Sequence, residues 1–472
     1  MSCLTKNIHF TDEKLQQLVG EVENAVSLSS VVCIGWQIAI RLTLLLIEEI
    51  LDKRALRPTV WPACPKCGKS LQSKGFAKRQ ITTRIGVIHF CRRIGRCRNR
   101  CRIGQVAPLD TELQLAPHQH SCVSFKRLAC LLAVFVPYQT ASKLLNELTS
   151  IEVSAKAIWH WTQNAGQRAI DTLNDELQTL AQGKAVDVES ADPDTENLPL
   201  LIGADGVMVP LRQQQGSPKG SIRWREVKVG IVTRLGFRRQ KAPNDSGNPQ
   251  TQLIQRRLVA CLGNIDDLGQ RLWLQAVRSG VLTAKQVVWL SDGARGFWRL
   301  FETYFAHSAI GILDFYHAAQ HLSKAAKAWL DGRTTPARVW FVSARHRLRH
   351  GPSMSVRMDI EKALTQKDLN DSQRKVLSNL INYLDTHQSH IQYHQYKAQG
   401  LPIGTGMVES ACKWLIIQRF KGVGMRWSEP GFNTLLHLRL AWTNNRFDEL
   451  FSASPASDYA RQRVGSPSTV SC

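Results

Sequence analysis

Three acidic residues stand in settings that suit the binding of divalent metal ions. Asp205 lies in the apolar run LPLLIGADGVMVPL, Asp292 ends the run KQVVWLSDG, and Glu409 opens the helical segment MVESACKWLIIQRF. Mg²⁺ and Mn²⁺ prefer oxygen ligands, and two such ions can activate an attacking oxygen and stabilise a leaving oxygen in phosphodiester chemistry. We therefore predict that Asp205, Asp292 and Glu409 bind two Mg²⁺ or Mn²⁺ ions.

An alternative interpretation exists for the two aspartates. Both precede glycine, and Asp-Gly is a common turn dipeptide, so a hairpin turn also fits Asp205. The order of the surrounding elements favours metal ligands, because it makes the two strands that carry Asp205 and Asp292 neighbours in one sheet.

The elements that must position these residues begin near residue 200. Three strand-like runs are followed by a helix and then by alternating strands and helices. The order β-β-β-α-β-α-β-α is that of a ribonuclease-H-like domain. We predict an α/β catalytic core with a mixed five-stranded sheet, interrupted by an all-helical insertion over residues 325–400.

Upstream of this core, two cysteine pairs have the spacing of a zinc ribbon. Cys64-x2-Cys67 and Cys97-x3-Cys101 can close a tetrahedral Zn²⁺ site that substitutes for a hydrophobic core. The second spacing is one residue longer than usual, and Cys91 is a competing fourth ligand. We predict a structural Zn²⁺ site; the alternative is a ribbon that folds by packing alone.

A helical stretch follows, and TASKLLNELTSIEVSAKAIWHWTQNAG fits a helix-turn-helix with Ser154 as an N-cap. Beside a basic zinc module, this pair is a candidate for DNA contact. The predicted organisation is a helical region (1–57), a zinc-ribbon-like module (58–110), a helix-turn-helix region (111–184), a linker (185–199), the first part of the core (200–324), the insertion (325–400), the C-terminal helices of the core (401–450) and a Ser-rich tail expected to be disordered (451–472).

Charge and hydropathy restrict the class of protein. Lys and Arg number 61 against 38 Asp and Glu, a net charge of +23, which favours a polyanionic partner such as double-stranded DNA. The most apolar run, over residues 31–51, is interrupted by Gln37 and Arg41, so we predict a buried helix and no membrane span. The first residues lack an apolar signal-peptide core, and the clustered cysteines favour metal binding in a reducing cytoplasm.

Several of these segments together resemble a known family. GADGVMVPLR, WREVKVGIVTRLG, SDGARGFW, DFYHAAQHL and GTGMVESACKWLIIQRFKGVGMRWSEPG are similar to motifs of bacterial insertion-sequence transposases with a DDE triad, the Kra branch above all and mutator-type transposases more distantly. The resemblance covers residues 55–450. It implies that Asp205, Asp292 and Glu409 form the catalytic triad, that the helical stretch is the family's insertion domain, and that the protein acts on the bacterial nucleoid.

Other residues near these motifs are candidates for auxiliary roles. Asp314 also ends a strand and is the rival of Asp292 as second carboxylate; the resemblance places Asp314 and His317 in an Asp-x-x-His element beside the site. Glu226 is either close to the metals or the ion-pair partner of a neighbouring Arg or Lys. The candidates for phosphate contact follow Glu409 on the late helix: Lys413, Arg419 and Lys421.

These observations predict a DNA transposase that binds the terminal repeats of its element, cleaves DNA and joins the freed 3′ ends to target DNA. Synapsis of two ends implies a homo-oligomer. Two alternatives remain: a ribonuclease-H-like nuclease without strand joining, and a non-catalytic zinc-containing DNA-binding regulator.

Overall fold

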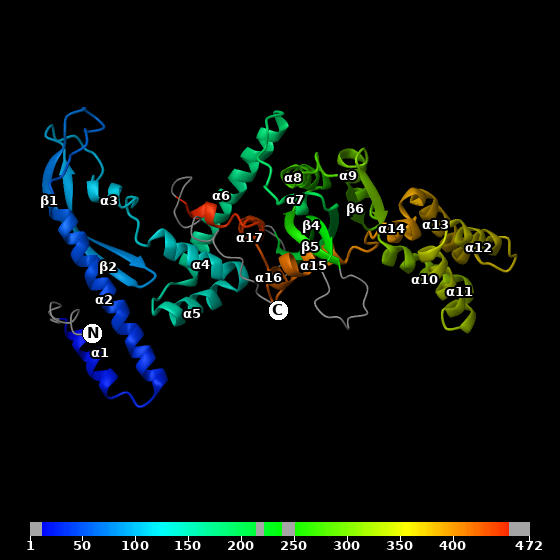
Figure 1. The fold of residues 1–472 in the computed structure, drawn as a ribbon, viewed down its shortest axis with the longest axis horizontal. Helices are drawn as coiled ribbons and strands as arrows, with labels where there is room; N and C mark the ends of the chain where they lie inside the picture. Colours follow the sequence, from blue (N-terminus) through cyan, green and yellow to red (C-terminus); the bar gives the residue numbers. More distant parts are fainter. Residues whose placement is uncertain (1–11, 214–220, 238–250, 453–472) are drawn as a thin grey trace. The chain divides into compact units, whose positions relative to one another are not determined.

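The computed structural model describes residues 12–213, 221–237 and 251–452 (Figure 1). The chain divides into two compact units, residues 1–162 with 451–472, and residues 163–450. The division falls within the long helix α6 (Ala155–Ala181). The predicted disordered tail lies outside the described residues from 453 onward.

The first unit begins with a helical hairpin. Helix α1 (Glu13–Glu23) starts at Asp12, whose carboxylate accepts a hydrogen bond from the N–H of Leu15 (2.9 Å). The same carboxylate accepts a hydrogen bond from Nε of Arg41 (3.0 Å) on helix α2 (Leu28–Leu56). Asp12 therefore both caps α1 and attaches it to α2.

Helix α2 is less buried than its composition predicts. Its residues Leu44 and Leu51 pack on the antiparallel hairpin of β1 (Gln72–Thr83) and β2 (Gly86–Arg96). Only 6% of its most apolar window is buried, although by length and composition the helix could also cross a membrane. The prediction of a buried helix over residues 31–51 is therefore wrong, because only part of its circumference contacts other elements of this unit.

Four helices follow the hairpin: α3 (Pro108–Glu112), α4 (Val123–Phe135), α5 (Tyr138–Thr149) and α6. The turn between α5 and α6 contains Ser150 in the left-handed conformation (φ 55°). The Oγ of Ser154 accepts a hydrogen bond from the N–H of Ala157 (3.2 Å), which confirms the predicted N-cap. Helices α4, α5 and α6 share a core of Phe125, Ala129, Ala133, Ala141, Leu145, Ile151 and Ile158, whereas Leu109 of α3 packs with α2 and the hairpin.

The second unit contains the predicted mixed five-stranded sheet. Its strands are β3 (Leu200–Arg212), β4 (Ile222–Phe237), β5 (Thr251–Cys261), β6 (Val287–Ser291) and β7 (Ala309–Leu313), in the order β5-β4-β3-β6-β7. β3, β4 and β5 are antiparallel, whereas β6 and β7 run parallel to β3. This arrangement is consistent with the predicted ribonuclease-H-like fold.

Helices connect the parallel strands. α8 (Ile265–Arg278) begins with a capping box in which Asn264 and Asp267 each accept a hydrogen bond from the other's backbone N–H. α9 (Arg295–Tyr304) joins β6 to β7. The predicted linker contains the short helix α7 (Pro193–Glu196) and is attached to the core through an ion pair of Glu189 with Arg257 (2.6 Å).

A helical segment separates β7 from the end of the core, as the sequence predicts. It comprises α10 (Phe315–Leu330), α11 (Thr335–His350), α12 (Met354–Leu364), α13 (Asp371–Thr386), the 3₁₀ turn Gln388–His390 and α14 (Tyr393–Ala398). The core then ends with α15 (Gly406–Cys412), a π-helical turn (Lys413–Ile417), α16 (Gln418–Phe420), α17 (Glu429–Thr443) and the 3₁₀ turn Asp448–Phe451.

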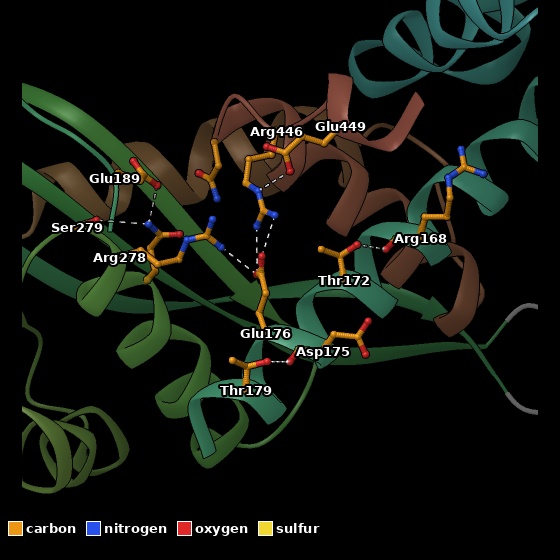
Figure 2. Close-up of polar contacts among 12 residues, drawn as sticks. Arg168, Thr172, Asp175, Glu176, Thr179, Glu189, Arg278, Ser279, Arg446 and Glu449 are labelled. Atoms are coloured by element: carbon orange, nitrogen blue, oxygen red, sulfur yellow. Dashed lines mark hydrogen bonds and ion pairs between the residues drawn. The ribbon is translucent and has the colours of Figure 1, made fainter. Parts of the chain in front are cut away.

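Ion pairs join the C-terminal part of α6 to the rest of this unit (Figure 2). The carboxylate of Glu176 pairs with Arg278 at the end of α8 (2.9 Å) and with Arg446 (2.8 Å), and Arg446 also pairs with Glu449 (3.0 Å). A cavity of about 250 Å³ lies beside this cluster. The predicted catalytic residues Asp205, Asp292 and Glu409 do not line this cavity.

Candidate active site

Three neighbouring parallel strands bring an aspartate to the same level of the sheet: Asp205 lies within β3, whereas Asp292 and Asp314 directly follow β6 and β7. Ala204 of β3 is paired with Ser291 of β6, and Ser291 is paired with Leu313 of β7. Asp205 follows Ala204 in the chain, Asp292 follows Ser291, and Asp314 follows Leu313. Because parallel strands present their carboxyl ends at one edge, this register places the three aspartates side by side.

Helix α15 brings Glu409 to the same place. Gly203 and Asp205 lie on one face of β3, since side chains alternate along a strand. A Cβ at Gly203 would lie 2.6 Å from Cγ2 of Val408, so α15 rests directly on this glycine. Glu409 follows Val408 and is exposed, which leaves its carboxylate accessible from solvent.

The charges of these residues act on one another. Burial raises the pKa of Asp205, and the carboxylates of Asp292 and Glu409 raise it further, against the lowering effects of the Gly206 N–H (2.7 Å) and of His317. Close carboxylates resist joint ionisation, and bound cations remove that repulsion. This all-oxygen donor set fits Mg²⁺ or Mn²⁺. The structure thus brings the three predicted residues together, while their catalytic role stays a prediction.

Asp314 has a different environment from Asp292. Its Oδ1 accepts hydrogen bonds from the N–H groups of Tyr316 (2.6 Å) and His317 (2.8 Å). Its Oδ2 accepts from the N–H (2.6 Å) and the hydroxyl (2.5 Å) of Thr405, and the residue is 1% exposed. Both oxygens are therefore occupied within the chain, and Asp314 connects the start of α10 to Thr405, the N-cap of α15.

The pKa of Asp314 reflects these hydrogen bonds. Burial opposes ionisation of Asp314, but the His317 side chain and the hydrogen bonds from Thr405 outweigh it and lower the pKa of Asp314 to about 2. By contrast, Oδ1 of Asp292 accepts one hydrogen bond, from the N–H of Ala294 (3.0 Å). Asp292 thus has more capacity for a metal ion, which favours it over Asp314 as the second carboxylate.

His317 lies beside Asp314 and is influenced by the charges of Asp292 and Asp205. Its Nδ1 is 3.6 Å from Oδ1 of Asp314, and its side chain is 39% exposed. The Asp314 carboxylate raises the pKa of His317 against the effect of burial, and Asp292 and Asp205 raise it further. A protonated imidazole here adds one positive charge at the rim of the site.

Tyr383, which was not predicted from the sequence, lies against Gly293 of the Asp-Gly turn. A Cβ at Gly293 would be 2.8 Å from Cε2 of Tyr383 and 3.0 Å from its Oη. The hydroxyl is buried and has no hydrogen-bond partner among the described residues, while the ring stacks on His321 (4.0 Å between centroids). Burial raises the pKa of Tyr383, and Asp292 and Asp314 raise it further.

Glu226 lies away from the carboxylates. A Cβ at Gly206 would contact Oε1 of Glu226, so Glu226 lies on the face of the sheet opposite Asp205, and it pairs with Lys228 (3.0 Å). The ion-pair interpretation of Glu226 is therefore the one that fits the structure.

The predicted phosphate-binding residues differ in exposure. Lys413 and Lys421 are exposed, and Nζ of Lys421 lies 5.7 Å from the ring of Trp224. Arg419 is only 2% exposed, and its guanidinium covers the ring of Trp427 at 5.2 Å. This burial contradicts the predicted DNA contact of Arg419, because a charge held in the interior is not presented to a phosphate.

In the first unit, the structure brings together the four predicted cysteines of the zinc ribbon. The sulfurs of Cys64, Cys67, Cys97 and Cys101 all lie within 4.8 Å of one another. Burial opposes ionisation of Cys97, but backbone and thiol hydrogen bonds outweigh it and lower its pKa to about 6. Cys91 is outside this cluster, and its N–H donates to Asp52 (2.9 Å). The cluster can hold a tetrahedral Zn²⁺ ion.

Comparisons with known proteins give little further information. No family model matches the chain, and no curated protein matches it. One similar solved structure is described as the Drosophila P element transposase strand transfer complex; it is 10% identical, covers 73% of this chain and 96% of that chain, and has a TM-score of 0.32. At this sequence identity and TM-score, the likeness does not show what this chain does.

Proposed function

We propose that this protein is a DNA transposase that cleaves DNA and transfers the freed 3′ ends through Asp205, Asp292 and Glu409. The observation that carries the proposal is the meeting of three carboxylates at one edge of the sheet, two from adjacent parallel strands and one from α15. The motifs similar to insertion-sequence transposases of the Kra branch support the same assignment.

Each carboxylate has a distinct structural support. Asp205 and Asp292 are fixed by the register of β3 and β6, whereas Glu409 is held by the contact of α15 with Gly203. Two divalent ions held by these residues would supply the charge that activates the attacking oxygen and stabilises the leaving oxygen. Water and a DNA 3′-hydroxyl are alternative nucleophiles for one such site, so a single set of residues serves both cleavage and joining.

Residues around the carboxylates would assist the reaction. Protonated His317, whose side chain is 39% exposed, is a cation beside Asp314 and would stabilise negative charge that develops on the phosphate oxygens. The buried hydroxyl of Tyr383 has no hydrogen-bond partner among the described residues and lies against Gly293, so it would donate to the neighbouring Asp292 carboxylate and hold it in place. Asp314 acts as a positioning residue, because its hydrogen bonds to Thr405 fix the start of α15.

The remaining features fit recognition of double-stranded DNA. The net charge of +23 favours binding to the phosphate backbone, and the exposed Lys413 and Lys421 lie on the segment that follows Glu409. The zinc ribbon and the α5–α6 pair would recognise the terminal repeats, and synapsis of two ends requires a homo-oligomer.

The assay that tests this proposal mixes the purified protein with labelled duplexes from the ends of its own element, a supercoiled plasmid and Mg²⁺ or Mn²⁺. Labelled DNA joined to the plasmid supports the transposase. Cleavage without joining supports the ribonuclease-H-like nuclease, and sequence-specific binding without cleavage supports the DNA-binding regulator.

A further inference from the structure

A cavity of about 250 Å³ lies over strand β5 of the second unit, between helices α6, α8 and α17. Each helix turns one face towards it, with lining residues at positions i, i+3, i+4 and i+7 that begin at Ala169 on α6, at Arg271 on α8 and at His437 on α17. The carboxylates of the candidate active site are not among the lining residues, so the proposed chemistry does not use this cavity.

The middle of the cavity is apolar. Leucines from the three helices and from β5 line it: Leu173, Leu274, Leu440 and Leu258. Asn444 holds β5 against α17, because its side-chain amide exchanges two hydrogen bonds with the backbone of Leu258 (2.9 and 2.8 Å). An engineered apolar cavity of about 150 Å³ binds benzene, so the present volume admits a molecule of roughly ten non-hydrogen atoms.

Three arginines line the cavity, and two of them are neutralised within the chain. Arg278 and Arg446 share the carboxylate of Glu176 (2.9 and 2.8 Å), as Figure 2 shows. Arg271, two turns before Arg278 on α8, forms no ion pair with any carboxylate of the described residues. The cavity therefore holds one positive charge that lacks a counter-ion.

The guanidinium of Arg271 is fixed through one of its nitrogens. Its Nη1 donates to the carbonyl of Ala260 (3.2 Å) and lies 3.3 Å from Nε2 of His437. Nδ1 of His437 lies 2.8 Å from the carbonyl oxygen of Asn433, which only accepts, so Nδ1 carries the proton and Nε2 accepts from Arg271. Burial and the charge of Arg271 lower the pKa of His437 to about 4, so the ring is neutral at pH 7.

The other edge of the same guanidinium is open. Nε and Nη2 of Arg271 donate to none of the described residues. These two N–H groups form the planar fork that accepts both oxygens of a carboxylate in parallel. A charge-assisted pair of this kind is stronger in an apolar cavity than in bulk water.

We propose that this cavity binds a small monocarboxylate, with its carboxylate on the Nε–Nη2 fork of Arg271 and its apolar body between the leucines. One unpaired cation matches one negative charge, whereas the charges at the Glu176 end are already balanced. The bound molecule contacts α6, α8 and α17 together, so it stabilises their packing. This inference goes beyond the proposed function and does not depend on it.

The test is isothermal titration calorimetry of the full-length protein at pH 7 with benzoate and octanoate, which are of the size the cavity admits. Benzoate should bind with a Kd below about 1 mM. Benzamide, which has the shape of benzoate without its charge, should bind at least ~10-fold more weakly, because it cannot form the charged pair with Arg271.

Two arginine variants separate the free charge from the paired one. Arg271→Gln should weaken benzoate binding by roughly 10- to 100-fold. The matched control Arg278→Gln alters the same face of the same helix and should bind benzoate like the wild type, since that charge is neutralised by Glu176.

A further variant keeps the proposal falsifiable if the loss of Arg271 impairs folding. Ala441→Phe places a ring in the cavity and leaves Arg271 in place, so it should abolish the binding of benzoate and octanoate while the protein still melts cooperatively. Absence of binding by both acids at up to about 10 mM would overturn the proposal. So would equal affinity for benzamide and benzoate, or undiminished benzoate binding by Arg271→Gln.

Discussion

Burial and the neighbouring carboxylates of Asp292 and Glu409 all raise the pKa of Asp205. Its pKa is raised in the folded protein, so its ionised form costs stability, and that cost increases as the pH rises through the folded pKa. A bound divalent cation reverses this effect, because it stabilises the ionised form. Stability in the absence and presence of metal therefore reports on the site without any DNA.

Substitution of Asp205 with Asn removes that cost. In EDTA at pH 7–8 we expect Asp205→Asn to melt at a higher temperature than the wild type, and the difference to shrink as the pH is lowered and the wild-type carboxyl becomes protonated. Millimolar Mn²⁺ should raise the melting temperature of the wild type only. Scanning calorimetry measures both effects, and equal stabilisation of the variant by Mn²⁺ would show that Asp205 is not a ligand.

The contribution of the Tyr383 hydroxyl to the cleavage rate can be tested separately from that of the carboxylates. Tyr383→Phe keeps the ring against Gly293 and removes only the hydroxyl, so DNA affinity should be unchanged. A hydrogen bond to a charged group contributes about 1.5–3 kcal/mol, which corresponds to a fall of roughly 10- to 100-fold in the cleavage rate. Single-turnover cleavage with Mg²⁺ measures this.

The control for this change lies in the same insertion. The hydroxyl of Tyr396 donates to the carbonyl of Ser389 (2.9 Å), so Tyr396→Phe loses a hydroxyl that does not face the carboxylates. An equal loss of rate in the two variants would mean that Tyr383 acts through the packing of the insertion and not on the Asp292 carboxylate.

At the scale of elements, the position of α15 on β3 depends on Gly203. An added Cβ would lie 2.6 Å from Val408 and 2.9 Å from the carbonyl oxygen of Leu290, so Gly203→Ala must displace α15. Overpacking of this kind costs about 1–3 kcal/mol of stability, and the shift of Glu409 should reduce cleavage by about 100-fold.

Gly406 provides the matched control for that substitution. It is the first residue of α15, and a Cβ there would meet nothing within 4 Å. Gly406→Ala should leave both the melting temperature and cleavage close to wild type. If Gly203→Ala were also silent, the contact between α15 and β3 would not be what positions Glu409.

The zinc ribbon makes an equally direct prediction. Cys97→Ser should lose the ~1 equivalent of zinc that a four-cysteine site holds, and the β1–β2 hairpin should become sensitive to proteolysis. Cys91→Ser should retain the metal, because Cys91 lies outside the cluster. Metal content is measured by mass spectrometry of the purified proteins, and zinc retained in Cys97→Ser would exclude this ligand set.

The sequence predicted those features that depend on local pattern. The apolar runs around Asp205 and Asp292 are sufficient to place Asp205 on a strand and Asp292 directly after one, and the cysteine spacing is sufficient to predict the four-cysteine cluster. Tyr383 could not be predicted, because its contact with Gly293 arises from the folding of the insertion over a strand about 90 residues away. The burial of Arg419 and the exposure of α2 could not be predicted from the sequence either. Hydropathy shows which residues are apolar, but it does not show which other residues cover them.

At the scale of the whole molecule, the chain combines a large excess of positive charge with a group of carboxylates at one edge of the sheet. A net charge of +23 favours a polyanionic partner, and divalent ions would neutralise the mutual repulsion of these carboxylates.

The central claim is that Asp205, Asp292 and Glu409 perform the chemistry, whereas Asp314 positions α15. The most direct test is strand transfer by Asp205→Asn, Asp292→Asn, Glu409→Gln and Asp314→Asn under identical conditions. We predict that the first three abolish joined product, by about 10³-fold or more, and that Asp314→Asn reduces it by about tenfold through the loss of one charged hydrogen bond. Joined product retained by Asp292→Asn and abolished in Asp314→Asn would contradict the account.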